Sequence, residues 1–262
     1  MTDTAGAARL LEVRGVTVRF GGIVALDDVS FAIRPGTICG LIGPNGAGKT
    51  TLFNCLSRLY TPTQGEINFD GQPLLSLSRH RIAELGIGRT FQNLALFSHM
   101  TVMENVMVGT HARTHASFVG TGLRLRSAMK EEREIQDTAL AMVRYLDLEP
   151  VMHMPAAGLA FGTLKRVELA RALAGNPKLL LLDEPAGGLN HEEVSDLAGL
   201  IRRLRDERHI TVLLVEHHMN LVMQVSDQVL ALNFGRKMAD GTPAEVRGNP
   251  EVIKAYLGGG KG

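Results

Sequence analysis

The chain has 262 residues, with 28 Lys or Arg against 27 Asp or Glu, so its formal net charge is only +1. This balance argues against a nucleic acid or an anionic bilayer recognised through overall charge. Two cysteines are too few for a disulfide framework, and a chain of this length can bury a core without one, which favours a reducing compartment. No apolar run approaches the ~18 residues needed to span a bilayer, and the first residues lack the layout of a signal peptide, so we expect no membrane crossing.

The first third of the chain predicts an antiparallel region followed by α/β structure. Short apolar runs alternate over residues 11–33, on both sides of Gly21 and Gly22, as expected for a hairpin. A short apolar strand, a glycine-rich turn and a helix follow at residues 37–42, 43–48 and 49–57. A further strand and a further helix are predicted at residues 65–69 and 79–85.

The middle of the chain predicts a helical region and the last third predicts a return to α/β structure. Strand patterns vanish between residues 100 and 174, and the amphipathic stretch 129–148 places Ile135, Leu140, Val143 and Leu146 near one face. Strands are then predicted at residues 179–182, 211–215 and 228–232, and helices at residues 192–208 and 218–225. This alternation is typical of a parallel sheet.

The turn before the first α/β helix matches the phosphate-binding pattern G-x-x-x-x-G-K-[ST], and it lies between a strand and a helix, as that pattern requires. Glycines allow backbone N–H groups to face phosphate oxygens, and the start of the helix adds a positive dipole. We expect Lys49 to neutralise the β and γ phosphates of ATP, Thr50 to offer a hydroxyl to Mg²⁺, and Thr51 to continue the helix. The motif residues are Gly43, Pro44, Asn45, Gly46, Ala47, Gly48, Lys49 and Thr50. The alternative is a glycine-rich turn without a ligand, which a chance match would explain in about one chain of a hundred.

Two acids close the apolar strand 179–182, where ligands of open α/β sheets bind. Asp183 is positioned to hold Mg²⁺, and Glu184 to polarise a water for attack on the γ-phosphate. The competing interpretation is an acidic turn in solvent, which the presence of the phosphate loop disfavours.

The order of these motifs along the chain resembles that of ABC-transporter nucleotide-binding subunits. The resemblance covers nearly the whole chain, and it implies that Phe20 stacks on adenine, that Gln92 contacts Mg²⁺ and the attacking water, and that His217 contacts the γ-phosphate. It further implies that the attacking water lies between Glu184 and His217. Taken singly, a core or hairpin aromatic, a solvated amide and a surface histidine remain open alternatives for these three residues.

The segment Leu159-Ala-Phe-Gly-Thr163 corresponds to the family signature LSGGQ, which caps ATP held by the opposite subunit. Only the Leu and Gly162 match, so Ala160 lacks the hydroxyl and Thr163 replaces the usual Gln, while the backbone at the helix start still offers donors to an anion. Asn190 occupies a position of the D-loop at which Asp is common.

The resemblance implies a fold class and a domain organisation. We expect an α/β P-loop NTPase core with a mostly parallel sheet, an N-terminal antiparallel β subdomain and an inserted helical subdomain, all in one ABC ATPase domain over residues 1–262. The core is expected over about 1–99 and 175–240, the helical subdomain over about 100–174, and a C-terminal helix with a tail over 241–262.

Narrower motifs, among them Arg19-Phe-Gly-Gly, Val215-Glu-His-His-Met and Ala255-Tyr-Leu-Gly, resemble the longer ATPase subunit of bacterial branched-chain amino acid importers. Such systems pair a second nucleotide-binding subunit with two membrane permeases and a periplasmic binding protein, which places this chain on the cytoplasmic face of the inner membrane. Leu96, Phe97 and Met100 are expected to receive a permease, although packing within the helical region explains each of them as well.

Other functions remain as alternatives at this stage. Related motors carry urea, amides or aromatic acids, and the transported molecule never touches this subunit. A non-transport ABC ATPase acting on nucleic acid usually has two motor units or a long coiled-coil insert, and neither is present. A P-loop GTPase would need an Asn-Lys-x-Asp motif, which the chain lacks.

Overall fold

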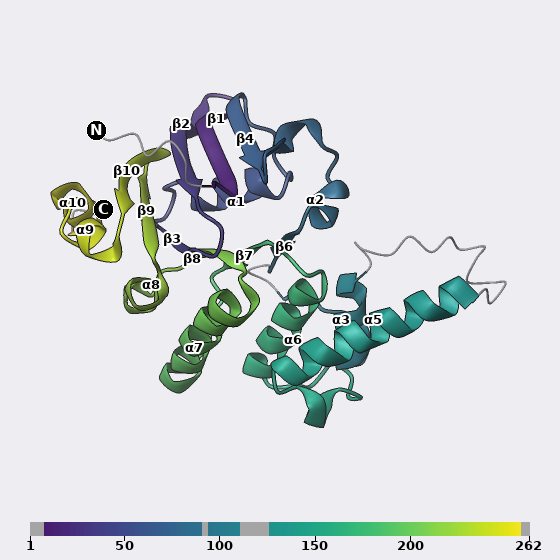
Figure 1. The fold of residues 1–262 in the computed structure, drawn as a ribbon. Helices are drawn as coiled ribbons and strands as arrows, with labels where there is room; N and C mark the ends of the chain where they lie inside the picture. The colour runs from purple at the N-terminus through teal and green to yellow at the C-terminus, as the bar shows by residue number, and fades with distance from the viewer. Residues whose placement is uncertain (1–7, 91–93, 111–125, 258–262) are drawn as a thin grey trace. The chain divides into compact units, whose positions relative to one another are not determined.

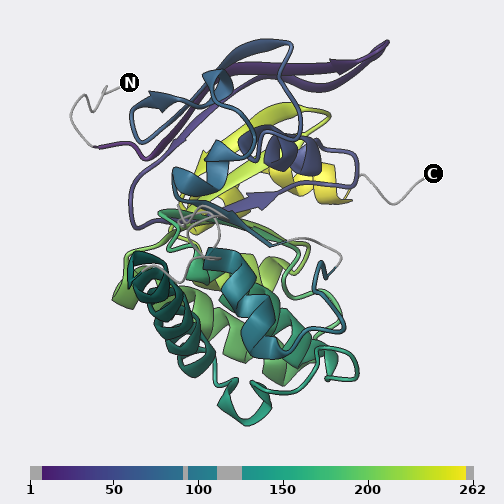
Figure 2. The same cartoon turned by 90° about the vertical axis from the view of Figure 1, so that its right-hand side faces the viewer.

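The computed structural model describes residues 8–90, 94–110 and 126–257 (Figure 1, Figure 2). The described chain forms two compact units, which are taken one at a time below. The first contains the residues up to Ile82 and those from Leu181 onward, and the second contains Ala83–Leu180.

The first unit begins with a four-stranded antiparallel sheet in the order β2-β1-β4-β5. Its register pairs Leu11 with Ile33 and Phe20 with Ile23, so the predicted hairpin is confirmed. Alternating apolar residues of β1 are buried, as the period-two pattern requires. The strands are β1 (Leu11–Phe20), β2 (Ile23–Ile33), β4 (Gln64–Phe69) and β5 (Gln72–Pro73).

A six-stranded sheet follows in the order β10-β9-β3-β8-β7-β6. The central strand β3 is parallel to both of its neighbours, β8 and β9, whereas β10 turns back antiparallel on β9. The strands are β3 (Ile38–Ile42), β6 (Ile87–Arg89), β7 (Leu179–Asp183), β8 (Thr211–Val215), β9 (Gln228–Asn233) and β10 (Arg236–Gly241). The predicted parallel strands are therefore present within one residue of their expected ends, while β6 and β10 were not predicted.

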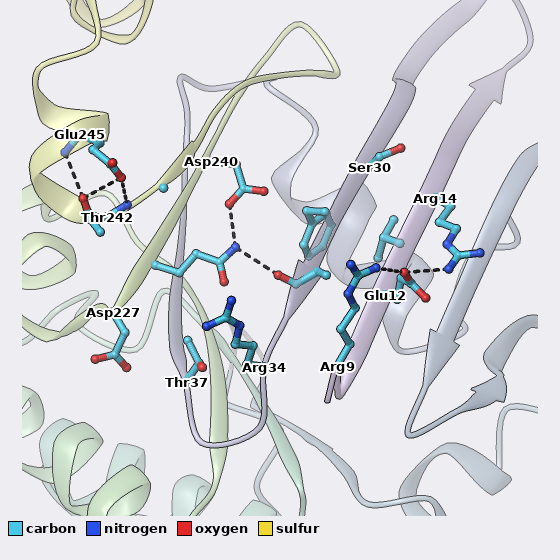
Figure 3. A pocket seen from close by; sticks show the side chains of 15 residues that line it. Arg9, Glu12, Arg14, Ser30, Arg34, Thr37, Asp227, Asp240, Thr242 and Glu245 are labelled. Atoms are coloured by element: carbon cyan, nitrogen blue, oxygen red, sulfur yellow. Dashed lines mark hydrogen bonds and ion pairs between the residues drawn. The ribbon is translucent and has the colours of Figure 1, made fainter. Parts of the chain in front are cut away.

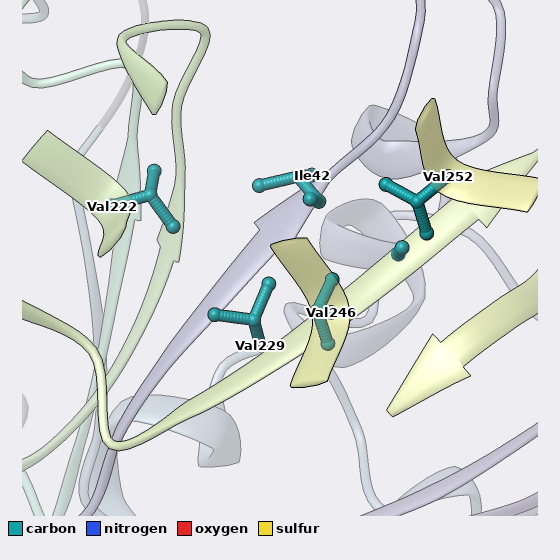
Figure 4. Close-up of a cluster of buried hydrophobic side chains, with 6 residues drawn as sticks. Ile42, Val222, Val229, Val246 and Val252 are labelled. Carbon is teal, nitrogen blue, oxygen red and sulfur yellow. The ribbon is translucent and has the colours of Figure 1, made fainter. Parts of the chain in front are cut away.

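The strands β3, β7 and β8 are buried at every residue, which explains why their sequences are continuous apolar runs instead of alternating ones. Helices of the first unit are α1 (Lys49–Leu56), α7 (His191–Arg208), α8 (Met219–Val225), α9 (Pro243–Arg247) and α10 (Pro250–Leu257). One core cluster joins β3, α8, β9, α9 and α10 through Ile42, Val222, Val229, Val246 and Val252 (Figure 4). The C-terminal helices thus pack on the strand that leads into the phosphate motif.

The C-terminal region differs from the single helix that the sequence predicts. It contains β10 and two short helices, because the segment Gly248-Asn249-Pro250 ends α9 and starts α10. The Asn249 side chain accepts a hydrogen bond of 2.8 Å from the Glu251 amide, which fixes the new helix start. Two further short elements lie between β5 and β6, a 3-10 turn at Leu74–Ser76 and α2 (Arg81–Glu84).

The described part of the second unit contains the packed helices α3 (Val102–Val108), α5 (Arg126–Tyr145) and α6 (Phe161–Ala174). Gly109, at the end of α3, lies so close to α6 that an added Cβ would be 1.9 Å from the Arg171 carbonyl oxygen. Val143 on α5 and Leu146 just after it are buried, and Ile135 and Leu140 on α5 are half-buried, so the predicted apolar face is confirmed. Within the described part of the chain, no helix combines the length and the apolar character that a membrane span requires.

Candidate functional site

The phosphate motif is a turn that only glycine can make at two of its positions. Gly43 and Gly48 have φ values of 154° and 101°, and both also lack space for a side chain. A Cβ on Gly43 would lie 2.3 Å from the Leu232 carbonyl oxygen, and one on Gly48 would lie 2.7 Å from the Ala25 carbonyl oxygen. The strand β3 therefore delivers the chain into a turn whose backbone is packed tightly against its surroundings.

A second turn, between β9 and β10, is hydrogen-bonded to the phosphate turn. The Gly235 amide donates to the Ala47 carbonyl at 3.0 Å, and the Asp27 amide donates to the Gly235 carbonyl at 2.9 Å. This contact was not predicted from the sequence, although Asn-Phe-Gly after a predicted strand is a turn signal. The phosphate turn is therefore connected through Gly235 to the backbone of Asp27 in β2.

Lys49 is buried, with 6% of its surface exposed, and its ammonium donates to the carbonyl oxygens of Gly43 at 2.7 Å and Pro44 at 3.0 Å. Burial lowers the pKa of Lys49, and the nearby carboxylates of Glu184 and Asp183 partly offset that effect. The ammonium therefore lies among the carbonyls of the turn and near both predicted acids. Beside it, Thr50 is exposed at the first turn of α1.

The start of α1 has no side chain that caps it. Gly48 at the N-cap makes no side-chain hydrogen bond, and no acid lies in the first turn. The free amides and the helix dipole at this end suit an anion such as phosphate.

The predicted acids and the histidine meet where β7 and β8 end. The Glu184 amide donates to the Val215 carbonyl at 2.9 Å, so the last residues of both strands lie at the same edge of the sheet. Asp183 is buried as the final residue of β7, with 5% of its surface exposed. The His217 Nε2 atom lies 2.6 Å from the Glu184 Oε1 atom, so these two predicted catalytic side chains are in direct contact.

An additional carboxylate, Glu216, is buried between these segments, and it was not predicted as a site residue. It accepts hydrogen bonds from backbone amides on both sides, which are described further below. A sequence signal existed, because an acid directly after a fully apolar strand is placed at the sheet edge.

Phe20 lies at the end of β1 with 46% of its surface exposed, so it is not a core residue. Its ring packs edge-on against the ring of Tyr60, with the centroids 5.2 Å apart. An exposed aromatic pair of this kind offers a flat apolar face to a base. Nothing in the sequence around Tyr60 marked it as part of this pair.

The C-terminal helix α10 reaches the phosphate turn through Tyr256. Partial burial raises the pKa of the Tyr256 phenol, and the nearby backbone of Gly43 acts in the opposite direction.

In the second unit, Gly162 lies in the first turn of α6, whose N-cap is Ala160. This helix start makes no side-chain cap and has no acid in its first turn. Phe161 is exposed, and the Lys165 ammonium lies 5.5 Å above the centroid of its ring. Backbone donors at this position are therefore present even though the signature is degenerate.

The segment predicted to meet a permease is also in the second unit, although Gln92 falls outside the described residues. Phe97 and Met100 are exposed, whereas Leu96 is half-buried and contributes less surface than predicted. Asn105 is fully buried and holds this segment by accepting from the Phe97 amide and donating to the carbonyls of Phe97, Met100 and Thr101. The exposed apolar side chains thus stand on a fixed backbone.

A groove of about 710 Å³ in the first unit is separate from the phosphate turn (Figure 3). Several charged side chains that line the groove already have partners. Glu12 forms ion pairs with Arg9 and Arg14, and Glu245 forms a capping box with Thr242 at the start of α9. None of the phosphate-motif residues lines it.

The residues of the site fit a magnesium ion together with a nucleotide. Among the described residues, no group of three or more His, Cys, Asp or Glu side chains is placed to hold a metal without a ligand's help. Thr50 carries a hydroxyl and Asp183 a carboxylate, which are hard oxygen groups of the kind that Mg²⁺ takes as ligands.

Two family models match the chain. The model described as "ABC transporter" matches residues 26–187, and the model described as "Branched-chain amino acid ATP-binding cassette transporter" matches residues 236–262. The second match contains β10, α9 and α10, including Tyr256.

Curated relatives match over almost their whole length. The chain is 45% identical to the high-affinity branched-chain amino acid transport ATP-binding protein BraF of Pseudomonas aeruginosa over 249 residues, which cover 95% of this chain and 98% of BraF. It is 43% identical to the corresponding protein LivG of Escherichia coli K12, with the same coverage.

Solved structures show the same fold. The ADP conformation of MJ1267, an ATP-binding cassette of an ABC transporter, superposes with a TM-score of 0.83 at 28% identity, covering 96% of this chain and 100% of that one. The dimeric structure of MJ0796, a bacterial ABC transporter cassette, superposes with a TM-score of 0.75 at 26% identity, covering 89% and 98%.

Proposed function

The chain belongs to the ABC transporter family of ATP-binding subunits, whose members are ATPases coupled to transport, and from this premise we propose that it is the motor of a branched-chain amino acid importer. The observation that supports this substrate class most directly is the match of residues 236–262 to the branched-chain amino acid family, together with the 45% identity to BraF. Motors for urea, amides or aromatic acids are the alternative within the same family.

We propose that the phosphate turn 43–48 binds the triphosphate of ATP, with Phe20 against the adenine. The packed turn, the uncapped start of α1 and the buried ammonium of Lys49 support this assignment. When phosphates approach, the Lys49 ammonium exchanges two carbonyl partners for phosphate oxygens, which are stronger acceptors because they are charged. Thr51 extends α1 behind this contact.

Thr50 and Asp183 are the residues that would hold Mg²⁺ here, and Gln92 is a third proposed ligand. A bound Mg²⁺ would neutralise the charge that develops on the transferred phosphoryl group. Asp183 is suited to this role because it is buried at the strand end and its neighbour Glu184 points to a different partner, His217.

Glu184 is proposed to polarise the attacking water and His217 to contact the γ-phosphate. Their direct contact of 2.6 Å leaves no space for a water between them, so the pair must separate before hydrolysis. A γ-phosphate that accepts a hydrogen bond from His217 Nε2 would release Glu184 for this work. Phosphate binding and activation of the base would then be one event.

Gly162 is proposed to cap the ATP of a facing subunit through the backbone at the start of α6. The dimeric cassette of MJ0796 supports pairing as the working state of this fold. We propose a second nucleotide-binding subunit as the facing partner, and two membrane permeases that contact Phe97 and Met100. A periplasmic binding protein would act indirectly, and the chain would work at the cytoplasmic face of the inner membrane.

The experiment that tests this proposal reconstitutes the chain in proteoliposomes with the permeases and the second ATPase subunit of a branched-chain amino acid importer. ATP hydrolysis should be stimulated by a binding protein loaded with leucine, isoleucine or valine. Stimulation by urea or an aromatic acid alone would assign the motor to another importer, and stimulation by none of these solutes would contradict an importer of this group.

A further inference from the structure

Glu216 lies directly after β8 and only 2% of its surface is exposed. Burying a carboxylate carries a large free-energy penalty unless hydrogen-bond donors surround it. We therefore consider which groups surround Glu216. Neither ATP nor Mg²⁺ is assigned to it in the proposal above.

Backbone amides from two segments hold this carboxylate. Its Oε1 atom accepts from the Ala186 amide at 2.7 Å, in the turn after β7. Its Oε2 atom accepts from the His217 amide at 3.0 Å and, at a longer 3.4 Å, from the His218 amide. One side chain thus connects the turn that leads toward α7 with the segment that begins α8.

The bonds of Glu216 lie between two other contacts of the same segments. On one side the Glu184 amide donates to the Val215 carbonyl at 2.9 Å. On the other side the His217 imidazole touches the Glu184 carboxylate at 2.6 Å. Glu184 also has a positive φ of 48°, a strained conformation for a residue with a side chain, so its orientation depends on support from its surroundings.

We propose that Glu216 is a positioning residue that fixes Glu184 and His217 relative to each other by joining the backbone of the 184–186 turn to the backbone of 217–218. This proposal rests on the proposed function. The same carboxylate couples the two segments. A displacement of the His217 backbone would displace Glu216, and with it the Ala186 amide of the 184–186 turn.

A carboxylate suits this position better than other side chains of its size. All of its partners are N–H donors, and a carboxylate offers acceptors on both oxygens. In Glu216→Gln, the new NH₂ group must face the Ala186 amide or the His217 amide, and it loses one of the two connections. Glu216→Asp keeps the charge but is shorter by one methylene group.

The first test compares ATP hydrolysis and ATP binding by the full-length chain together with its partner nucleotide-binding subunit. Glu216→Gln should lower kcat about 10- to 100-fold, the range expected when a supporting hydrogen bond to a catalytic group is removed, and change the Kd for ATP less than threefold. Glu216→Asp should recover part of the loss. The matched control is Glu66→Gln on β4, an exposed acid for which kcat should not change.

A double-mutant cycle separates positioning from a general structural effect. In a His217→Ala background, Glu216→Gln should cause less than a threefold further loss of kcat, because the pair it aligns is already broken. An equal loss in both backgrounds, or a kcat within twofold of the unmodified chain for Glu216→Gln alone, would overturn the proposal. So would a loss of ATP affinity that follows a loss of folded protein in both the Gln and Asp variants.

Hydrogen exchange of the full-length chain provides a measurement that does not depend on turnover. Glu216→Gln should raise the exchange rates of the peptides that contain residues 184–187 and 216–219 together, and unchanged exchange in either peptide would contradict the connection. If the unmodified chain and its partners show no ATPase activity, the proposed function fails while this exchange result still decides the role of Glu216.

Discussion

Two groups of helix starts in this molecule are built in opposite ways. The starts of α3, α7 and α9 carry complete capping boxes, formed by Thr101 with Glu104, Asn190 with Glu193, and Thr242 with Glu245. The starts of α1, α6 and α8 carry no side-chain cap and no acid in the first turn.

The uncapped starts follow the phosphate turn, the signature segment and His217, which are the three places proposed to meet phosphate. Where the chain must stabilise a helix by itself, it supplies a hydroxyl or amide and a carboxylate. Where phosphate is the expected partner, a built-in acid would compete with it through charge and through the same amides. The absence of a cap is therefore informative about ligand binding, and the predictions below test this contrast.

The largest expected effect is on the rate of ATP hydrolysis. Glu184→Gln should retain ATP binding but lower hydrolysis about 10²- to 10⁴-fold, because the amide cannot take a proton from water. Size-exclusion chromatography with ATP should show a stable closed dimer of this variant with its partner subunit. Rapid turnover would remove Glu184 from its role, and the exposed Glu192→Gln on α7 serves as the control.

The next effect concerns affinity at α1. Lys49→Ala should weaken ATP binding about 10- to 100-fold, the range for a lost hydrogen bond to a charged group, while the uncapped backbone still provides some binding. Isothermal titration measures this change. Lys130→Ala, which removes an exposed ammonium from α5, should leave the Kd unchanged, and equal losses in both variants would indicate only a general charge effect.

Adding an acid to the first turn of an uncapped helix tests this contrast. Thr163→Glu places an acid at the third helical position of α6 and should stabilise the unit by ~0.3–1 kcal/mol through the helix dipole. The same charge should weaken ATP-dependent pairing about tenfold, since it repels the phosphate of the facing site. Sedimentation in the Glu184→Gln background measures the pairing, and an unchanged or stronger dimer would contradict the role proposed for Gly162 and its neighbours.

The reverse change at a capped start should affect stability alone. Thr101→Ala removes the hydroxyl that accepts from the Glu104 amide at 3.2 Å, and it should lower the free energy of unfolding by about 1 kcal/mol. The Kd for ATP should not change. A shift in ATP affinity as large as that of Lys49→Ala would show that capped and uncapped starts are not functionally distinct.

The smallest effect is a pH dependence of the capped starts. Hydrogen bonds from the Thr101 backbone and hydroxyl lower the pKa of Glu104 below its usual 4.5. A carboxylate with a lowered folded-state pKa contributes stability above pH 4.5, and that contribution is lost as the pH falls through the folded-state value. Urea unfolding from pH 6 to pH 3 should therefore bring Thr101→Ala and the unmodified chain closer together at low pH, and a constant difference would exclude this linkage.

Much of the candidate site could be predicted from the sequence. Lys49, Asp183 and Glu184 belong to local patterns in which an apolar strand ends in a turn or an acid, so their positions follow from chain order. The parallel strands were predictable for the same reason, because burial on both faces makes them continuously apolar.

The supporting contacts could not be predicted, because they join residues that are distant in the chain. Gly235 is hydrogen-bonded to Ala47 although the two residues lie in distant parts of the chain, and Tyr60 contacts Phe20 through the fold and not through sequence proximity. Glu216 was part of a recognised motif, yet its partner Ala186 lies on a different strand end. The two-helix form of the C-terminal region depended on the cap at Asn249, whose effect competes with a continuous apolar pattern.

We propose that the packed turn and Lys49 bind a triphosphate whose Mg²⁺ is held by Thr50 and Asp183. Titration of the full-length chain with ATP in the presence of Mg²⁺ and then of EDTA tests it most directly, with Asp183→Asn measured alongside. We predict tighter binding with Mg²⁺ and loss of that difference in Asp183→Asn. Equal affinity with and without Mg²⁺, or a metal effect that survives in Asp183→Asn, would contradict the account.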